Sequence, residues 1–392
     1  MSESTTATNG RPASGGNGAA ATLTKKDFAS DQETRWCPGC GDYAILATVQ
    51  QFLPELGIPP ERIVFVAGIG CSGRFAYYMS TYGLHGIHGR APALATGLAL
   101  ARPDLSIWVV TGDGDGLSIG GNHLIHALRR NVPIKILLFN NQIYGLTKGQ
   151  YSPTSEVGKV TKSTPFGSLD QPFNPLSLAL GAEATFVART VDTDRKHQAD
   201  ILRAAAGHQG SALVEIYQNC NVFNDGQFSD IVRKQQRDEM MIELVDGEPI
   251  RFGAEGERGV VRDAGGRLRV ADVAEAGDRA LVVHDAHDPN PSQAFALAHL
   301  ADQPTGPTPI GVFRAAERPV FAAELTRVPE QVFRNATELF ATSTAGGVMP
   351  IATLDGEPVG DGSPGPVTRR LRDLYWAAHD DPRYTTPVDY AA

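Results

Sequence analysis

Short apolar runs alternate with helical patterns between residues 36 and 217 of the chain. Runs such as residues 134–139 are continuously apolar, which is typical of parallel strands covered on both faces of a sheet. This alternation predicts an α/β domain with a doubly wound, mostly parallel sheet. We expect Asp42 to cap the first helix with its side chain. The expected strands are residues 62–67, 106–111, 133–140, 184–189 and 211–217, and the expected helices are residues 43–56, 91–101, 119–130 and 195–207.

The two ends of the chain differ in composition from this α/β region, which we assign to residues 31–240. Residues 1–30 are rich in Ser, Thr, Gly, Ala and Asn and lack apolar periodicity, so we expect a disordered tail. Residues 241–342 combine Gly- and charge-rich pieces with helical patterns at 292–300 and 329–342, which predicts a small α+β extension. Residues 343–392 are rich in Gly, Pro and Asp and are predicted to be extended or disordered.

Composition and charge exclude several classes of function. The formal net charge is −9 over 392 residues, which argues against nucleic-acid binding because that requires clustered basic residues. No apolar run approaches the roughly 20 residues of a transmembrane helix. The first ten residues have neither the basic nor the apolar region of a secretory signal. We therefore expect a cytoplasmic protein that is not associated with a membrane.

A Gly-Asp-Gly-Asp segment, residues 112–115, directly follows the predicted strand 106–111. Ligands of open α/β sheets bind beyond the carboxyl ends of strands, so Asp113 is placed to meet one. Gly112 and Gly114 allow the backbone to approach a phosphate closely, and a helix N-terminus nearby favours an anion. The carboxylate of Asp113 is a suitable Mg²⁺ ligand. A plain strand–helix–strand crossover with a Gly-Asp turn is the alternative interpretation.

Asn141 lies just past the next predicted strand, 28 residues after Asp113. Neighbouring parallel strands end at the same edge of a sheet, so Asn141 and Asp113 are expected to lie together. The amide oxygen of Asn141 and the main-chain carbonyl of Ile143 can complete the protein's share of an octahedral Mg²⁺ site.

The chain has four cysteines, at positions Cys37, Cys40, Cys71 and Cys220. The last two each follow a predicted strand, on the edge expected to hold Asp113. Four thiolates are the ligands of either a cubane iron–sulfur cluster or a structural zinc ion. Disulfides are disfavoured because cytosolic thiols stay reduced.

The segment GDGDGLSIGGNHLIHALRRNVPIKILLFNN resembles the thiamine diphosphate motif, which begins Gly-Asp-Gly and ends Asn-Asn. The chain also contains WCPGCGDYAIL, GIGCSGR, HGIHGRAPALATG and NNQIYGLTKGQYSPTS. Together these segments resemble the β subunits of 2-oxoacid:ferredoxin oxidoreductases, in particular the 2-oxoglutarate type, over roughly residues 33–340. The resemblance implies a thiamine diphosphate-binding fold, with Mg²⁺ held by Asp113, Asn141 and the carbonyl of Ile143.

The resemblance also implies roles for further residues. It assigns the four cysteines as ligands of one [4Fe–4S] cluster. His88 is a candidate for binding a phosphate oxygen or transferring a proton, although a capping or packed histidine is the alternative. Arg74 is a candidate partner of a substrate carboxylate, and Lys148 of the distal carboxylate of a dicarboxylic oxoacid; a surface or interface role is the alternative for Arg74. The residues implied in cofactor binding are Gly70, Ser72, His88, Gly89, Gly112, Asp113, Gly114, Asp115, Asn141, Gly145 and Leu146.

The implied activity is oxidative decarboxylation of 2-oxoglutarate to succinyl-CoA and CO₂, with thiamine diphosphate, coenzyme A and a cluster that passes electrons to ferredoxin. The chain has room for only one thiamine-binding domain, so a separate α subunit is expected to supply the activating Glu, in an α2β2 assembly. Three alternatives remain open. The first is the same chemistry with pyruvate or a branched-chain oxoacid as substrate. The second is a non-redox thiamine decarboxylase or carboligase, and the third is a zinc-stabilised structural or regulatory subunit.

Overall fold

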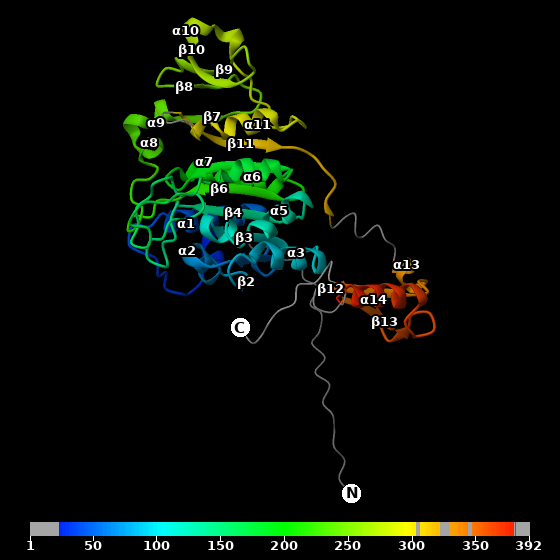
Figure 1. Ribbon diagram of the computed structural model, residues 1–392. Coiled ribbons are helices and arrows are strands. Elements are labelled where there is room, and N and C mark those ends of the chain that lie inside the picture. The colour runs from blue at the N-terminus through cyan, green and yellow to red at the C-terminus, as the bar shows by residue number, and fades with distance from the viewer. Residues whose placement is uncertain (1–22, 303–305, 322–329, 344–346, 380, 382–392) are drawn as a thin grey trace, which may run out of the picture. The chain divides into compact units, whose positions relative to one another are not determined.

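A computed structural model of the chain describes residues 23–302, 306–321, 330–343, 347–379 and 381 (Figure 1). The chain divides into two compact units, residues 1–322 and 323–392. An eight-stranded sheet is the centre of the first unit, and its strands run in the spatial order β2-β1-β3-β4-β6-β5-β11-β7. In this order the strands are β2 (Tyr82–His85), β1 (Ile63–Ala67), β3 (Ser106–Gly112), β4 (Lys135–Asn140), β6 (Ala212–Tyr217), β5 (Phe186–Val191), β11 (Thr308–Ala315) and β7 (Met241–Leu244).

The first six strands of this order are mutually parallel, and β11 runs antiparallel to β5. Consecutive strand residues point to opposite faces of the sheet, and helices cover both faces. Val64 and Val66 of β1 pack in the cluster that contains α3, α5, α6 and α11, whereas Phe65 packs in the cluster that contains α1 and α7. The predicted doubly wound, mostly parallel sheet is confirmed. The helices are α1 (Asp42–Phe52), α2 (Gly70–Gly73), α3 (Ala91–Ala101), α4 (Asp113–Gly116), α5 (Gly121–Arg129), α6 (Pro175–Gly181), α7 (Arg195–Gly207), α8 (Ser229–Val232), α9 (Lys234–Met240), α10 (Val273–Ala276) and α11 (Ser292–Ala298).

Several boundaries differ from the sequence-based expectation. A disordered tail was expected over residues 1–30, of which residues 1–22 lie outside the described residues. Phe28, within that expected tail, is fully buried in the core cluster that contains α1 and α7. The small α+β extension was expected over residues 241–342, and from this range β7 and β11 join the main sheet. Beyond them, β8 (Arg251–Phe252), β9 (Arg258–Arg262) and β10 (Leu268–Asp272) form a small antiparallel sheet. Asp42 does not cap α1: the helix begins at Asp42 itself, and Gly41 precedes it without a capping side chain.

The second unit has regular structure where an extended or disordered tail was expected. Helix α13 (Glu330–Arg334) ends early, and strand β12 (Leu339–Ser343) pairs with β13 (Gly347–Ile351), so the helix expected over 329–342 is wrong beyond residue 334. Strands β14 (Thr353–Leu354) and β15 (Glu357–Pro358) form a second hairpin before α14 (Pro366–His379). The carboxylate of Glu338 accepts the main-chain N–H groups of Val367 and Thr368 at the start of α14, at 3.2 and 3.0 Å. High Gly and Pro content therefore misled the prediction, because these residues form the turns between short elements.

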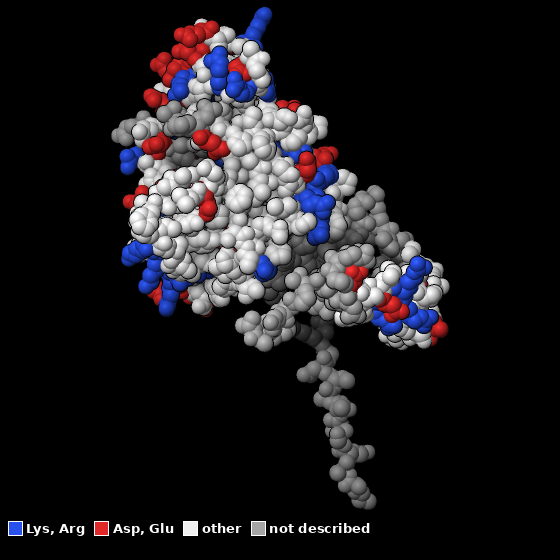
Figure 2. Space-filling model, in the orientation of Figure 1, with Lys and Arg blue, Asp and Glu red and all other residues white. Residues whose placement is uncertain are grey.

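Figure 2 shows Lys and Arg interspersed with Asp and Glu on the visible face of the molecule, without a continuous basic stripe. Across the described part of the chain, no helix combines the length and apolarity needed to cross a bilayer.

A buried ion pair joins β5 and β6 beneath the carboxyl ends of the strands. Arg189 Nε lies 2.7 Å from Glu215 Oε2, with the two side chains 1% and 0% exposed. Glu215 Oε1 also accepts a 2.7 Å hydrogen bond from Asn140, the last residue of β4. The pair therefore holds three adjacent strands in register close to where the chain presents its functional side chains.

Replacing Arg189 with Met is expected to lower the free energy of unfolding by about 3–5 kcal/mol, because it leaves the Glu215 carboxylate buried without its charged partner. Urea unfolding monitored by circular dichroism measures this change. The control is Arg203→Met, since Arg203 pairs with Glu55 at the surface and its side chain is 51% exposed, so a loss below about 1 kcal/mol is expected. If Arg189→Met and Arg203→Met lowered the free energy of unfolding equally, the larger effect expected for the buried ion pair would be contradicted.

Candidate functional site

Asp113 follows β3 and begins the single turn α4, at the carboxyl edge of the sheet. Its side chain is 2% exposed. Its Oδ2 accepts hydrogen bonds from the hydroxyls of Ser152 and Thr154, at 2.5 and 2.6 Å. Burial raises the pKa of Asp113 to about 6, and the two hydroxyls partly oppose this shift because they stabilise the charged form. A carboxylate held in this way is oriented for a cation.

Asn141 follows β4, and β4 pairs in parallel with β3, so the two strands end side by side. The amide Nδ2 of Asn141 donates to Gln218 Oε1 at 2.8 Å, and its Oδ1 accepts the main-chain N–H of Ile143 at 3.2 Å. Asp113, Asn141 and Ile143 line one cavity of about 100 Å³. The tertiary structure therefore brings together the three residues that the sequence assigned to Mg²⁺.

Most of the expected cofactor-binding residues line this first cavity. The expected cofactor-binding residues that line this cavity are Gly70, Ser72, Gly112, Asp113, Gly114, Asp115, Asn141, Gly145 and Leu146. Asp42 also lines it, although the role expected for Asp42 from the sequence was only that of a helix cap. Its side chain is 1% exposed, its Oδ2 has no hydrogen-bond partner among the described residues, and burial raises its pKa to about 7.

His88 and Gly89 lie beside the cavity, and the structure connects both to Asp115. The Oδ1 of Asp115 accepts the main-chain N–H of Gly89 at 2.7 Å and lies 3.0 Å from His88 Nδ1. Its Oδ2 accepts the Thr111 hydroxyl at 2.8 Å. Gly89 has a φ of 70°, and a Cβ there would stand 2.4 Å from the main-chain nitrogen of Gly120, so only glycine fits. Asp115 thus positions the 88–89 turn against the cofactor cavity.

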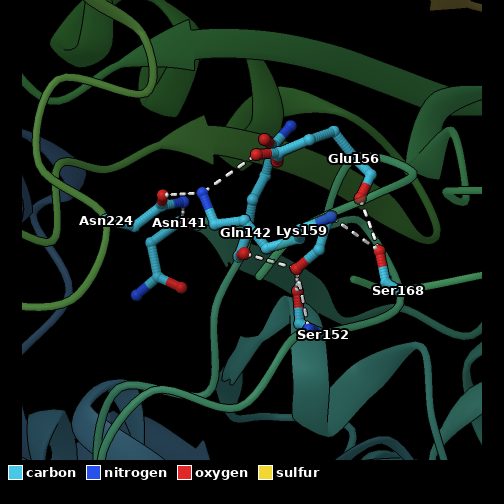
Figure 3. Close-up of polar contacts among 8 residues, drawn as sticks. Asn141, Gln142, Ser152, Glu156, Lys159, Ser168 and Asn224 are labelled. Atoms are coloured by element: carbon cyan, nitrogen blue, oxygen red, sulfur yellow. Dashed lines mark hydrogen bonds and ion pairs between the residues drawn. The ribbon is translucent and has the colours of Figure 1, made fainter. Parts of the chain in front are cut away.

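The loop that follows β4 is tied to the loop that follows β6 (Figure 3). Asn224 donates from Nδ2 to the main-chain oxygen of Asn141 at 2.9 Å, and its Oδ1 accepts from Lys159 Nζ at 2.5 Å. The hydroxyl of Ser155 donates to the carbonyl of Gln142 at 2.6 Å. Asn141 is therefore held through both its main chain and its side chain.

The four cysteines line a second cavity, of about 300 Å³. The main-chain N–H of Cys40 donates to the Cys37 carbonyl at 3.0 Å, which closes the Cys-Pro-Gly-Cys turn. A Cβ at Gly145 would lie 3.5 Å from Cys220 Sγ and 3.8 Å from Cys71 Sγ, so this glycine leaves room between them. Burial raises the pKa of Cys71 to about 12 and also raises that of Cys40, so a metal would have to displace thiol protons on binding.

Arg74 and Lys148 line this second cavity and not the first. Arg74 also donates from Nη1 to the main-chain oxygen of Arg35 at 2.5 Å. Their expected partners were substrate carboxylates, whereas the structure places them around the cysteines.

The two cavities adjoin. The residues that line both are Cys71, Asn141, Gly145, Leu146 and Gln218. Sequence reasoning missed Ser152, Thr154 and Gln218. Ser152 and Thr154 belong to the segment Ser-Pro-Thr-Ser, residues 152–155, whose three closely spaced hydroxyl residues were the available signal.

Comparison with known proteins identifies related chains. The family described as thiamine pyrophosphate enzyme, C-terminal TPP binding domain, matches residues 68–216. The 2-oxoglutarate oxidoreductase subunit KorB of Mycobacterium tuberculosis is 65% identical over 296 residues, which is 76% of this chain and 79% of that protein. The 2-oxoacid:ferredoxin oxidoreductase subunit beta of Saccharolobus solfataricus is 45% identical over 192 residues, 48% of this chain and 63% of that protein.

A solved structure is also similar to this chain. It is the 2-oxoglutarate:ferredoxin oxidoreductase from Magnetococcus marinus with 2-oxoglutarate, coenzyme A and succinyl-CoA bound. The TM-score is 0.64 at 34% sequence identity, and the match covers 80% of this chain and 91% of that one.

Proposed function

The chain belongs to the β subunits of 2-oxoacid:ferredoxin oxidoreductases, and on this premise we propose that it carries thiamine diphosphate and one [4Fe–4S] cluster in an enzyme that oxidises 2-oxoglutarate. The observation that carries the proposal is the sharing of five lining residues between the Asp113 cavity and the four-cysteine cavity. Two redox-linked cofactors can exchange electrons only when they lie close together, and these cavities adjoin.

The residues of the first cavity suit a metal-bound diphosphate. When bound, thiamine diphosphate supplies an electron sink on which a 2-oxoacid loses CO₂. Asp113, Asn141 and the carbonyl of Ile143 would hold its Mg²⁺, which prefers oxygen ligands. Gly112 lines the cavity without a side chain and leaves its backbone accessible to the diphosphate, whereas the Cβ position of Gly114 is occupied by the Tyr144 ring, 2.2 Å away. Asp115 would keep the 88–89 turn in place beside it, with His88 available to a phosphate oxygen or a proton.

The second cavity offers the ligand set of a cluster. All four cysteines line it, and four thiolates are the ligands of a cubane. Among the described residues, no group of three or more His, Cys, Asp or Glu side chains is already arranged around a metal ion, so metal analysis has to separate a cluster from a zinc ion. The thiolates of the four cysteines would hold the cluster, which would supply one-electron transfer to ferredoxin in a coenzyme A-dependent reaction.

A second subunit is expected to complete the site. Thiamine enzymes use a glutamate beside the aminopyrimidine ring, whereas the carboxylates among the described residues that line the first cavity are those of Asp42, Asp113 and Asp115. We assign that carboxylate to an α subunit in an α2β2 assembly. This chain alone should then be inactive, and full activity of the isolated chain would contradict the assignment.

The test is anaerobic co-purification with the α subunit, followed by metal analysis and assays with several oxoacids. About four irons per β chain and broad absorbance near ~400 nm are expected. Coenzyme A-dependent reduction of ferredoxin should be faster with 2-oxoglutarate than with pyruvate or branched-chain oxoacids. Colourless protein with one zinc would instead support a structural or regulatory subunit. Turnover without any electron acceptor would support a non-redox decarboxylase.

A further inference from the structure

Gln218 joins the two cavities through a continuous set of hydrogen bonds. It follows β6, is 1% exposed and lines both cavities. Its Oε1 accepts from Asn141 Nδ2 at 2.8 Å. Its Nε2 lies 3.2 Å from Cys40 Sγ and donates to the carbonyl oxygen of Asn219 at 2.7 Å. One buried side chain therefore contacts a candidate Mg²⁺ ligand and a candidate cluster ligand.

The orientation of this amide follows from its partners. The carbonyl of Asn219 can only accept a hydrogen bond, so the nitrogen of Gln218 must face it. The oxygen of Gln218 then faces Asn141, which must present its own nitrogen. The remaining oxygen of Asn141 accordingly points to Ile143, with which it shares the assigned cation site. The main-chain N–H of Gln218, bonded to the Asn140 carbonyl at 2.9 Å, anchors this arrangement to the sheet.

We propose that Gln218 is a positioning residue for both cofactors: it turns the amide oxygen of Asn141 toward Mg²⁺ and donates a hydrogen bond to the Cys40 thiolate of the cluster. The inference rests on the proposed function, since both cofactors belong to it. A hydrogen bond to a cluster sulfur stabilises the more negative, reduced state, so it makes the reduction potential more positive. Gln218 would thereby make the cluster a better electron acceptor while it holds the adjacent metal site in its binding geometry.

The geometry distinguishes Gln218 from its neighbours. The main-chain N–H of Asn219 donates to Asp192, and its side chain donates to Asp225, so neither reaches the sulfur. Gln218 Nε2, at 3.2 Å, is therefore the side-chain donor that reaches Cys40 Sγ among the described residues. Replacing Gln218 removes this donor without changing the cysteine itself.

The test uses Gln218→Met and Gln218→Glu in the α–β complex, with Gln51→Met as the matched control because Gln51 is exposed on α1. Redox titration of the cluster monitored by electron paramagnetic resonance should give a more negative potential for Gln218→Met. Thiamine diphosphate binding measured at varied Mg²⁺ should show about tenfold weaker Mg²⁺ affinity for the same variant. In Gln218→Glu, a protonated carboxyl can still accept from Asn141 and donate to the Asn219 carbonyl, so Mg²⁺ affinity like that of the unmodified protein is expected. Gln51→Met should change neither quantity.

The outcomes separate this inference from the proposed function. Protein without iron in the unmodified complex would overturn the proposed function. Full iron content with an unchanged potential in Gln218→Met would overturn the donation to Cys40 and leave the proposed function standing. If Gln218→Met does not retain iron, the Mg²⁺ measurement still decides: equal affinity in the Met and Glu variants would overturn the proposed orientation of Asn141.

Discussion

Replacing Cys71 with Ser is expected to remove almost all iron from the purified chain. Cys71 lines the cavity that the four cysteines share, and the sequence contains no fifth thiol that can take its place. A serine oxygen is a poor substitute because iron–sulfur clusters are held by thiolates. Iron and sulfide content after anaerobic reconstitution measures the effect, and the same result is expected for Cys37, Cys40 and Cys220.

The control for this series is a small exposed change elsewhere, Ala101→Ser at the end of α3, because every cysteine lies at the candidate site. It should retain full iron. Thermal unfolding of each variant reports whether the chain still folds. Any single cysteine variant that keeps four irons per chain would contradict the assignment of that cysteine as a cluster ligand. The four serine variants together test whether all four cysteines bind the same cluster.

Replacing Asp113 with Ala is expected to weaken Mg²⁺-dependent binding of thiamine diphosphate by about 30-fold or more. The change removes the only carboxylate among the three assigned Mg²⁺ ligands, and losing a buried charged partner costs about 2–5 kcal/mol, with 1.4 kcal/mol for each tenfold. It also leaves the hydroxyls of Ser152 and Thr154 without their shared acceptor. Tryptophan fluorescence during titration with the cofactor measures the affinity.

Two further variants make this experiment specific. Ser152→Ala removes one of the two hydroxyls that orient Asp113, so a smaller loss of about tenfold is expected. Asp104→Ala is the matched control, since Asp104 forms ion pairs with Arg62 and Arg102 at the surface. Affinity unchanged by Asp113→Ala would contradict its assignment to Mg²⁺. A loss in Ser152→Ala as large as that in Asp113→Ala would show that the hydroxyl binds the cofactor directly.

The sheet was predictable because its strands carry their own signal. Continuous apolar runs such as 134–139 indicate burial on both faces, and β4 occupies residues 135–140. The exposed edge strand β2 has no such run, and it was missed. The second unit was missed for another reason: its hairpins are short and its turns are rich in Gly and Pro, so composition obscured the strands and α14.

The sequence alone determined which residues gather at the carboxyl edge of the sheet. Asp113, Asn141, Cys71 and Cys220 each follow a strand, and parallel strands that are neighbours end side by side. Local periodicity is enough for that inference, because it locates the end of each strand.

Only the tertiary structure decided how those residues are held and which cavity each one lines. Ser152 and Thr154 reach Asp113 from a loop about forty residues later, Gln218 connects Asn141 with Cys40, and Lys148 lies beside the cysteines. These contacts depend on the paths of irregular loops. Such paths are set by individual side-chain hydrogen bonds and close packing, which leave no repeating pattern in the sequence.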